Sequence, residues 1–145
     1  GVTSTIRKTF ASLKDNAKLM VTEKLLTTDF QTAKTQFDVN LLGENSSVEI
    51  SSRSVAKNYS VQEFKSNIIG KNRCFGHVEC DGIVLDEARI VSIPKIDAAD
   101  NNASLVHEAA IGKIAGEELT KLMTLGLTRQ QAEEAIIQGF LMGDN

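Results

Sequence analysis

Tryptophan is absent from this chain of 145 residues, and aromatic residues together make up only 5%. A core without large aromatic anchors is built from Val, Ile, Leu and Ala, which favours stacked strands. Proline occurs once, at Pro94, so no proline-rich linker divides the chain. The length is enough for one domain with its own core and too short for two large ones.

Concentrated positive charge is also missing. The net charge is −3, and the longest basic run is Arg7-Lys8. Nucleic-acid binding needs dense positive charge, so we expect no nucleic-acid partner. No apolar run reaches the roughly 18 residues of a membrane span, and no signal-peptide pattern opens the chain, so we expect a cytoplasmic protein without membrane insertion. Because the sequence begins with Gly1 and not Met, we expect the natural chain to start further upstream.

Catalytic and cross-linking residues are scarce. The chain has two cysteines and two histidines, which leaves little material for a nucleophilic triad or a disulfide framework. The signatures G-x-S-x-G, H-E-x-x-H and the phosphate-binding Walker loop do not occur. We therefore expect reduced thiols and no enzymatic activity.

Short strands separated by polar turns fill the first ninety or so residues. The expected strands are 3–13, 17–26, 37–41, 48–55, 59–69, 75–85 and 89–93. Turns every 10 to 15 residues without helical periodicity between them favour an all-β architecture. A β-sandwich and a stacked β-helix both fit this spacing. The recurring strand, polar corner and strand favours stacked rungs, but no fixed repeat period is evident, so the residues alone leave the choice open.

The C-terminal residues change to a helical pattern. Glu117-Glu118 suits the first turn of a helix, where acids complement the dipole, and Gly126 suits the left-handed position that ends it. Thr128 and Gln131 have capping-box spacing for a second helix, which we expect to end at Gly139. Their apolar faces comprise Leu119, Leu122, Met123, Ala132, Ala135 and Ile136.

The sequence thus predicts a β core over 1–114 and a helical segment over 115–145. Two helices joined by a glycine turn also resemble ubiquitin-associated and helix-turn-helix modules. The second helix carries Glu133-Glu134 against one basic residue, Arg129, which is a poor surface for a DNA groove. Docking on the chain's own core or on a partner protein is the plainer interpretation.

One group of residues offers soft or titratable ligands: Cys74, His77, Glu79, Cys80, Asp81, His107 and Glu108. The cysteine spacing is not C-x-x-C, so it does not indicate a closed zinc or cluster site. On an extended strand, His77 and Glu79 would point to one face and Cys80 to the other. From spacing alone, Cys80 is a small buried side chain and His77 a surface residue, with metal binding as the alternative.

The motifs from His77 onward nevertheless form a long ordered series. The segment 77–86 reads H-V-E-C-D-G-I-V-L-D and is followed by I-P-K-I at 93–96 and by L-V-H-E-A-A-I-G-K-I at 105–114. G-L-T at 126–128 and Q-G-F at 138–140 complete it. This series resembles the C-terminal part of the SufB/SufD family of iron–sulfur cluster assembly proteins, and its cysteine and Glu108 resemble the SufB branch.

The resemblance implies a right-handed parallel β-helix followed by a short α-helical hairpin. It also implies a cytosolic scaffold that carries a nascent iron–sulfur cluster or sulfur, binds no cofactor permanently, and works with an ABC-type ATPase and a second SufB/SufD-type chain. By position, Cys80, Glu108 and His107 match the cluster or sulfur-accepting site, with Cys74 and His77 as secondary candidates. The ATPase-contacting residues would be Leu119, Leu122, Met123, Leu127, Ala132, Ile136 and Phe140.

Two features of the sequence keep other functions open. The hairpin carries Leu119 and Leu122 where many relatives have aromatic residues. An accessory subunit of an ABC-type ATPase that binds no metal is therefore the alternative, and it would tolerate serine at position 80. A degenerate enzyme or sugar-binding β-helix would need a row of exposed aromatic residues, and the one Tyr and six Phe supply few. For a scaffold, we expect a nearby cation to lower the pKa of Cys80.

Overall fold

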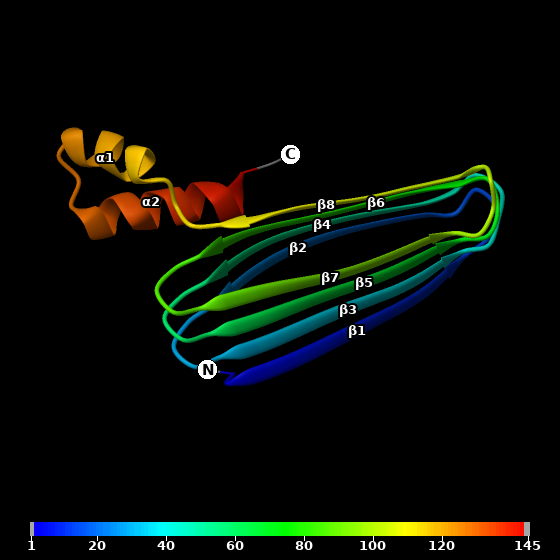
Figure 1. Cartoon of the computed structure of the whole chain (residues 1–145), viewed down its shortest axis with the longest axis horizontal. Helices are drawn as coiled ribbons and strands as arrows, with labels where there is room; N and C mark the ends of the chain where they lie inside the picture. Colours follow the sequence, from blue (N-terminus) through cyan, green and yellow to red (C-terminus); the bar gives the residue numbers. More distant parts are fainter. Residues whose placement is uncertain (1, 144–145) are drawn as a thin grey trace.

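A computed structural model describes residues 2–143 as eight strands followed by two helices (Figure 1). The strands are β1 (Ser4–Leu13), β2 (Lys18–Thr27), β3 (Thr32–Leu41), β4 (Ser46–Ala56), β5 (Val61–Gly70), β6 (Cys74–Val84), β7 (Arg89–Ala98) and β8 (Ala103–Gly112). The helices are α1 (Gly116–Thr124) and α2 (Arg129–Met142). No helix among residues 2–143 is long and apolar enough to cross a lipid bilayer.

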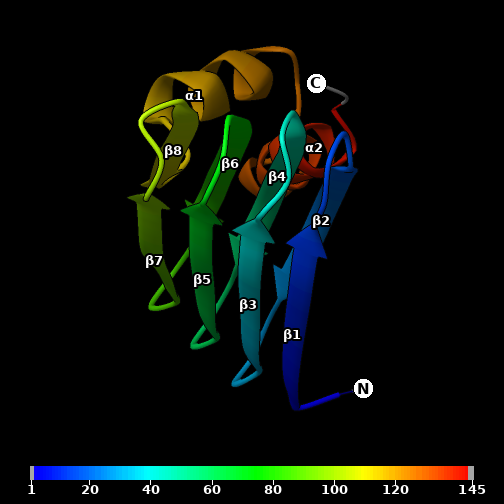
Figure 2. The ribbon, with the colours of Figure 1, turned by 90° about the vertical axis from the view of Figure 1, so that its right-hand side faces the viewer.

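The strands form two parallel four-stranded sheets, ordered β1-β3-β5-β7 and β2-β4-β6-β8, which face each other (Figure 2). Each strand pairs with the strand 28 or 29 residues further along, so that Ser4 lies beside Thr32 and Lys18 beside Ser47. The chain therefore winds as a parallel β-helix of about four turns. This confirms the stacked-rung prediction, and it reveals a repeat that the residue identities conceal.

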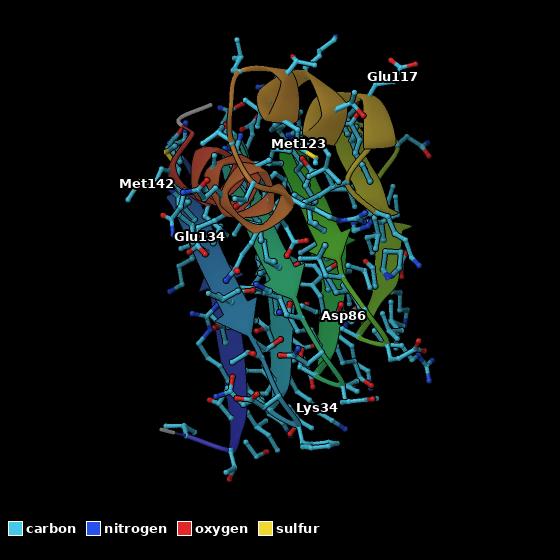
Figure 3. All side chains as sticks on the ribbon, turned by 90° about the vertical axis from the view of Figure 1, so that its left-hand side faces the viewer. Lys34, Asp86, Glu117, Met123, Glu134 and Met142 are labelled. Carbon is cyan, nitrogen blue, oxygen red and sulfur yellow. The ribbon has the colours of Figure 1, made fainter. Side chains whose placement is uncertain are left out.

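Asn and Asp residues shape the corners between strands. Five of them adopt positive φ angles of 55–59°: Asn16, Asp29, Asn45, Asn58 and Asp86. Asn and Asp tolerate this left-handed conformation better than most residues. They also bond between rungs, since Asn58 Oδ1 accepts from Thr28 Oγ1 at 2.6 Å and Asp86 Oδ2 accepts from the Asn58 amide at 3.0 Å. Figure 3 shows Asp86 at its corner, where the chain passes from one sheet to the other.

The core lies between the two sheets. Successive side chains of β3 to β6 alternate between this interior and the outer surface, as the period of a strand requires. The buried cluster is largely aliphatic and contains Phe37, Val39, Leu41, Val48, Ile50, Phe64, Ile68, Cys74, Val78 and Cys80. The prediction of an aliphatic core is thus incomplete, because Phe37 and Phe64 pack together with ring centroids 5.8 Å apart.

The helical hairpin docks on the outer face of the second sheet near the end of β4 (Figure 1). Arg53 on β4 donates to the carbonyl oxygens of Phe140, at 3.3 Å, and Gly143. Its guanidinium carbon lies 6.0 Å from the centroid of the Phe140 ring. Lys57, just after β4, forms an ion pair with Glu133 at 3.7 Å. Arg53 and Lys57 thus both bind α2 to the β-helix, and α2 also buries Ala132 and Ile137.

Some boundaries differ from the sequence prediction. β3 begins at Thr32 and not at 37, and β8 was not predicted at all. β7 continues through Pro94 because β7 is an edge strand, where the missing proline N–H interrupts no inter-strand ladder. α2 continues past Gly139 to Met142. The Thr128 capping box and the left-handed Gly126, with φ 95°, are both confirmed.

Candidate functional site

The alternation of β6 separates the residues of the H-V-E-C-D motif. Cys80 points into the core and is 1% exposed. His77, Glu79 and Asp81 occupy the opposite, outer face and are half-buried. The expected division of this motif between two faces is confirmed, so the chemistry of Cys80 is that of the β-helix interior.

A row of polar side chains crosses the interior at the level of Cys80. Glu23, Ser52 and Cys80 lie in register on β2, β4 and β6. The buried Glu23 carboxylate accepts hydrogen bonds from Ser52 Oγ at 3.1 Å and Thr35 Oγ1 at 3.0 Å, and it pairs with Arg7. Three donors satisfy this buried charge, as a charge in a core requires. Cys80 therefore lies at the end of a polar row in an otherwise apolar interior.

Burial determines the protonation of Cys80. Desolvation raises the pKa of this thiol above its ordinary value of 9.0, Asp81 raises it further, and only the Ser92 side chain lowers it. A buried thiol resists ionisation because its anion loses the solvation of water. The expected lowering of this pKa by a nearby cation is therefore wrong. At neutral pH Cys80 is a thiol and not a thiolate.

His107 also faces the interior, on the neighbouring strand β8 and in register with Val78 of β6. Among the buried side-chain atoms of residues 2–143, both ring nitrogens of His107 lack a hydrogen-bond partner. Burial, and secondarily the charge of His77, lowers the pKa of His107 below 6.5. The interior near Cys80 thus contains a neutral imidazole with two unused nitrogen atoms.

Glu108 does not join this pair. Its side chain is 65% exposed on the outer face, where Oε2 lies 3.0 Å from His77 Nε2. Glu79 is its neighbour in register. The three residues that the sequence resemblance predicted for one site are therefore divided within the chain, with Cys80 and His107 inside and Glu108 outside.

Cys74 is buried at the beginning of β6, and burial raises the pKa of its thiol. It shares the inner face with Cys80, but six residues of extended strand separate them, which corresponds to about 20 Å. The two sulfurs cannot bind one metal ion or form a disulfide at that separation. Within residues 2–143, no three His, Cys, Asp or Glu side chains are grouped so that they could hold a metal ion.

The outer face of the second sheet has a groove of about 600 Å³ beside the end of α2. Its walls include Met20, Glu49, His77 and Gly143. His77 therefore belongs to the surface beside the hairpin, and Cys80 to the interior beneath it.

The predicted partner-contacting residues of the hairpin have unequal exposure. Ala132 is fully buried, Phe140 packs against Arg53, and Leu119, Leu122, Leu127 and Ile136 are half-buried. Met123 is 45% exposed and Leu125, which sequence reasoning missed, is 80% exposed. Figure 3 shows Met123 on α1 and Glu134 on α2 at this end of the molecule.

Sequence reasoning also missed the interior polar residues Glu23, Ser52, Ser66 and Ser92. A signal for part of this set was present, because steps of 29 and 28 residues lead from Glu23 to Ser52 and then to Cys80. Finding it required the repeat, which only the register reveals.

The described residues thus form a parallel β-helix with Cys74, Cys80 and the ring of His107 on its inner face and a helical hairpin outside it. Residues 3–140 match the family model described as "SUF system FeS cluster assembly, SufBD core domain". The chain belongs to the SufBD family of iron–sulfur cluster assembly proteins.

Several curated relatives support this membership. An iron-sulfur cluster assembly SufBD family protein of Archaeoglobus fulgidus is 44% identical over 103 residues, covering 70% of this chain and 28% of the relative. Its counterpart in Methanothermobacter thermautotrophicus is 39% identical, covering 73% of this chain and 26% of the relative. That of Methanocaldococcus jannaschii is 34% identical, covering 90% and 42%. The chain thus spans a quarter to two fifths of the length of these relatives.

Proposed function

We propose that this chain is a scaffold component of iron–sulfur cluster assembly, in which Cys80 accepts sulfur or binds the nascent cluster as cargo. The observation that carries the proposal is the position of Cys80 in the interior, on the strand next to His107, whose ring nitrogens are unused. A buried nitrogen without a partner costs free energy, so such groups often mark a function.

The ligand set within one chain suits cargo that must leave again. A permanent iron–sulfur cluster is typically held by four cysteine thiolates, whereas this interior offers one thiol and one imidazole. Because the raised pKa keeps Cys80 protonated at neutral pH, binding iron must displace its proton. Mixed sulfur and nitrogen ligands are weaker than four thiolates, which favours release to an acceptor protein.

A second SufB/SufD-type chain would supply the remaining ligands. Within residues 2–143, β7 and β8 each pair with another strand on one side only, and their exposed apolar side chains include Ile93, Ile96 and Val106. Open edges with apolar side chains are surfaces on which another strand can pair. Glu108 lies on β8, so in this proposal it contributes to a site completed by the second chain and not to the Cys80 interior.

The hairpin is the proposed contact for an ABC-type ATPase in the cytoplasm. Met123 and Leu125 are the exposed apolar residues of α1 and its C-terminal cap. Leu119 and Leu122 are half-buried, so they would contribute only their exposed portions. Removing exposed apolar side chains from water against a partner protein is favourable.

Anaerobic reconstitution with ferrous iron and sulfide tests the scaffold role. We expect iron binding with thiolate-to-iron absorption in the parent chain, loss of both in Cys80→Ser, and retention in Cys74→Ser. The second variant is a matched control, since it also removes one buried thiol from the inner face of β6. Equal iron binding in Cys80→Ser would refute a role for this residue.

The alternative is an accessory subunit that binds the ATPase and no metal. It is favoured by the absence, within residues 2–143, of a group of three ligands suited to a metal ion. In that case Cys80→Ser would bind the ATPase as tightly as the parent chain and support cluster formation by the complex equally well. Leu125→Asp would then abolish function, whereas Cys80→Ser would not.

A further inference from the structure

The corner that follows β2, β4 and β6 repeats on three successive turns of the β-helix. Asp29, Asn58 and Asp86 hold equivalent places in it, because each has a positive φ angle of 55–58°. The Tyr59 amide donates to the Asp29 carbonyl oxygen at 2.9 Å. In the same way, the Glu87 amide donates to the Asn58 carbonyl oxygen at 3.0 Å. The next residue of each corner therefore forms a second column, which contains Phe30, Tyr59 and Glu87.

Two residues of this column are exposed aromatic side chains. Phe30 is 77% exposed and Tyr59 is 59% exposed. Their rings are stacked, with centroids 5.2 Å apart and an angle of 7° between the ring planes. Successive turns of a β-helix are about 4.8 Å apart, so the stack runs along the axis of the β-helix from one turn to the next. Phe30 therefore covers one face of the Tyr59 ring, and the other face is directed toward the turn that carries Glu87.

Glu87 places a negative charge at the next level of this stack. Its side chain is exposed and, within residues 2–143, forms no ion pair. Two cations lie close in the sequence and do not neutralise it. Lys57 pairs with Glu133, and Arg89 has no ion pair in the described part of the chain. The corner thus presents an open aromatic face and an unpaired carboxylate on adjacent turns.

We propose that the corner column of Phe30, Tyr59 and Glu87 binds an arginine side chain of a partner protein. A guanidinium group at the level of the Glu87 turn lies ~4.8 Å from the Tyr59 ring, within the roughly 6 Å of a cation–π contact. This planar group stacks on the ring as a third layer and donates two parallel hydrogen bonds to the Glu87 carboxylate. A lysine ammonium supplies the charge but not the planar stacking or the bidentate pairing.

The corner lies at the same end of the molecule as the helical hairpin (Figure 1). Figure 3 shows Asp86 of this corner and Met123 of the hairpin on that end. A protein bound to the hairpin therefore has the corner within reach. The inference goes beyond the proposed cluster chemistry, because it uses no residue of the β-helix interior.

The fluorescence of Tyr59 provides the measurement. Tyr59 is the only tyrosine in a chain without tryptophan, so its emission reports on this corner. The probe is the acetylated and amidated peptide Ala-Arg-Ala-Arg-Ala, titrated into the whole chain beside peptides with lysine or citrulline in place of arginine. We expect a saturable change with the arginine peptide and a dissociation constant about threefold higher with the lysine peptide. Citrulline is planar but uncharged, so its peptide should give no saturable change.

Two variants test the carboxylate. Glu87→Gln should raise the dissociation constant of the arginine peptide about threefold, which corresponds to ~0.7 kcal/mol and is the scale of an exposed ion pair. Glu117→Gln is the matched control, because it removes the same charge from an exposed position on α1, away from the corner (Figure 3). It should leave the dissociation constant unchanged.

Two further variants test the ring. Tyr59→Leu has no fluorophore, so its affinity is measured from the peptide-induced NMR shifts of the backbone amides in the corner. We expect the dissociation constant to rise about threefold when the aromatic face is lost. Tyr59→Phe keeps the ring and should bind the arginine peptide as tightly as the parent chain in the same NMR titration.

The absence of a saturable change with the arginine peptide would overturn the proposal. So would equal affinities of the arginine and lysine peptides, or of the arginine and citrulline peptides, because the site would then not recognise a guanidinium group. Equal weakening in Glu87→Gln and Glu117→Gln would reflect only the net charge of the chain, and unchanged affinity in Tyr59→Leu would exclude the ring. None of these measurements involves iron or sulfur, so this proposal and the proposed scaffold function fail separately.

Discussion

The inner and outer faces of β6 and β8 place neighbouring residues in different environments. Inside lie the buried Cys80 and the half-buried His107, whose ring nitrogens are shielded from water, whereas outside lie His77 and Glu108, paired and accessible to water. His107 and Glu108 are adjacent in the chain but belong to different environments. Alternate residues of a sequence motif in a strand therefore belong to different faces of the sheet, and each face has its own chemistry.

This division also separates two kinds of chemistry. Inner groups lose the solvation of water, which raises the pKa of Cys80 and lowers that of His107. Outer groups interact in a medium where water screens their charges. We infer that handling of sulfur belongs to the inner face, and that contacts with partner proteins belong to the outer face, the hairpin and the open edge.

The largest predicted effect comes from placing the same charge on each face in turn. Val78→Lys introduces a cation at a fully buried position, next to His107, and should reduce the free energy of unfolding by more than about 4 kcal/mol. His77→Lys changes the adjacent outer residue, can still pair with Glu108, and should shift it by about 0.5 kcal/mol or less. Urea unfolding measures both. Similar decreases in the free energy of unfolding for the two variants would contradict the difference between the two faces.

A smaller effect is expected where the outer face holds the hairpin. Arg53→Ala removes the hydrogen bonds to Phe140 and Gly143 and the contact with the Phe140 ring, at a cost of about 1–3 kcal/mol. Hydrogen exchange should become faster in α2 and stay unchanged in β6. Lys65→Ala is the control, since its ion pair with Glu63 lies on the other sheet. Faster exchange in β6 would show that the two faces are not independent.

The secondary structure could be predicted where a local signal determines it. The alternation of β6, the Thr128 capping box and the left-handed Gly126 each depend on residues within one element, and all are confirmed. The residues alone could not distinguish a β-helix from a β-sandwich. The 28- or 29-residue repeat of the β-helix is a repeat of strand alternation and corner positions, and residue identities do not follow it.

The candidate site was less predictable for a related reason. The motif resemblance selected Cys80, His107 and Glu108, but the direction of each side chain follows from the strand boundaries, and β8 was not predicted. Ser92, which lowers the pKa of the Cys80 thiol, lies on the opposite sheet, so no local spacing in the sequence could relate the two residues. The pKa of the Cys80 thiol depends on its burial, which is determined by all the stacked strands around it and not by the neighbouring sequence.

The smallest expected effect on stability is the pH dependence due to His107. Because burial lowers the pKa of His107 in the folded state, protonation favours unfolding. The neutral His107 side chain contributes fully to stability above its pKa in the unfolded state, which is about 6.5. This contribution declines as the pH falls from that value toward the lower pKa of the folded state. His107→Asn should flatten the stability profile between neutral and mildly acidic pH in urea titrations. His77→Asn should flatten the profile less, because burial lowers the pKa of His107 more than the charge of His77 does.

The most direct test of the account compares one residue from each face in the same iron–sulfur reconstitution. Cys80→Ser and Glu108→Gln are both mild substitutions at positions that the sequence resemblance predicted for the site. Iron content and visible absorption are measured for each variant beside the parent chain. The account predicts that Cys80→Ser loses iron, whereas Glu108→Gln retains most of it when no second SufB/SufD-type chain is present. Loss of iron in Glu108→Gln with retention in Cys80→Ser would contradict it, because the chemistry would then belong to the outer face.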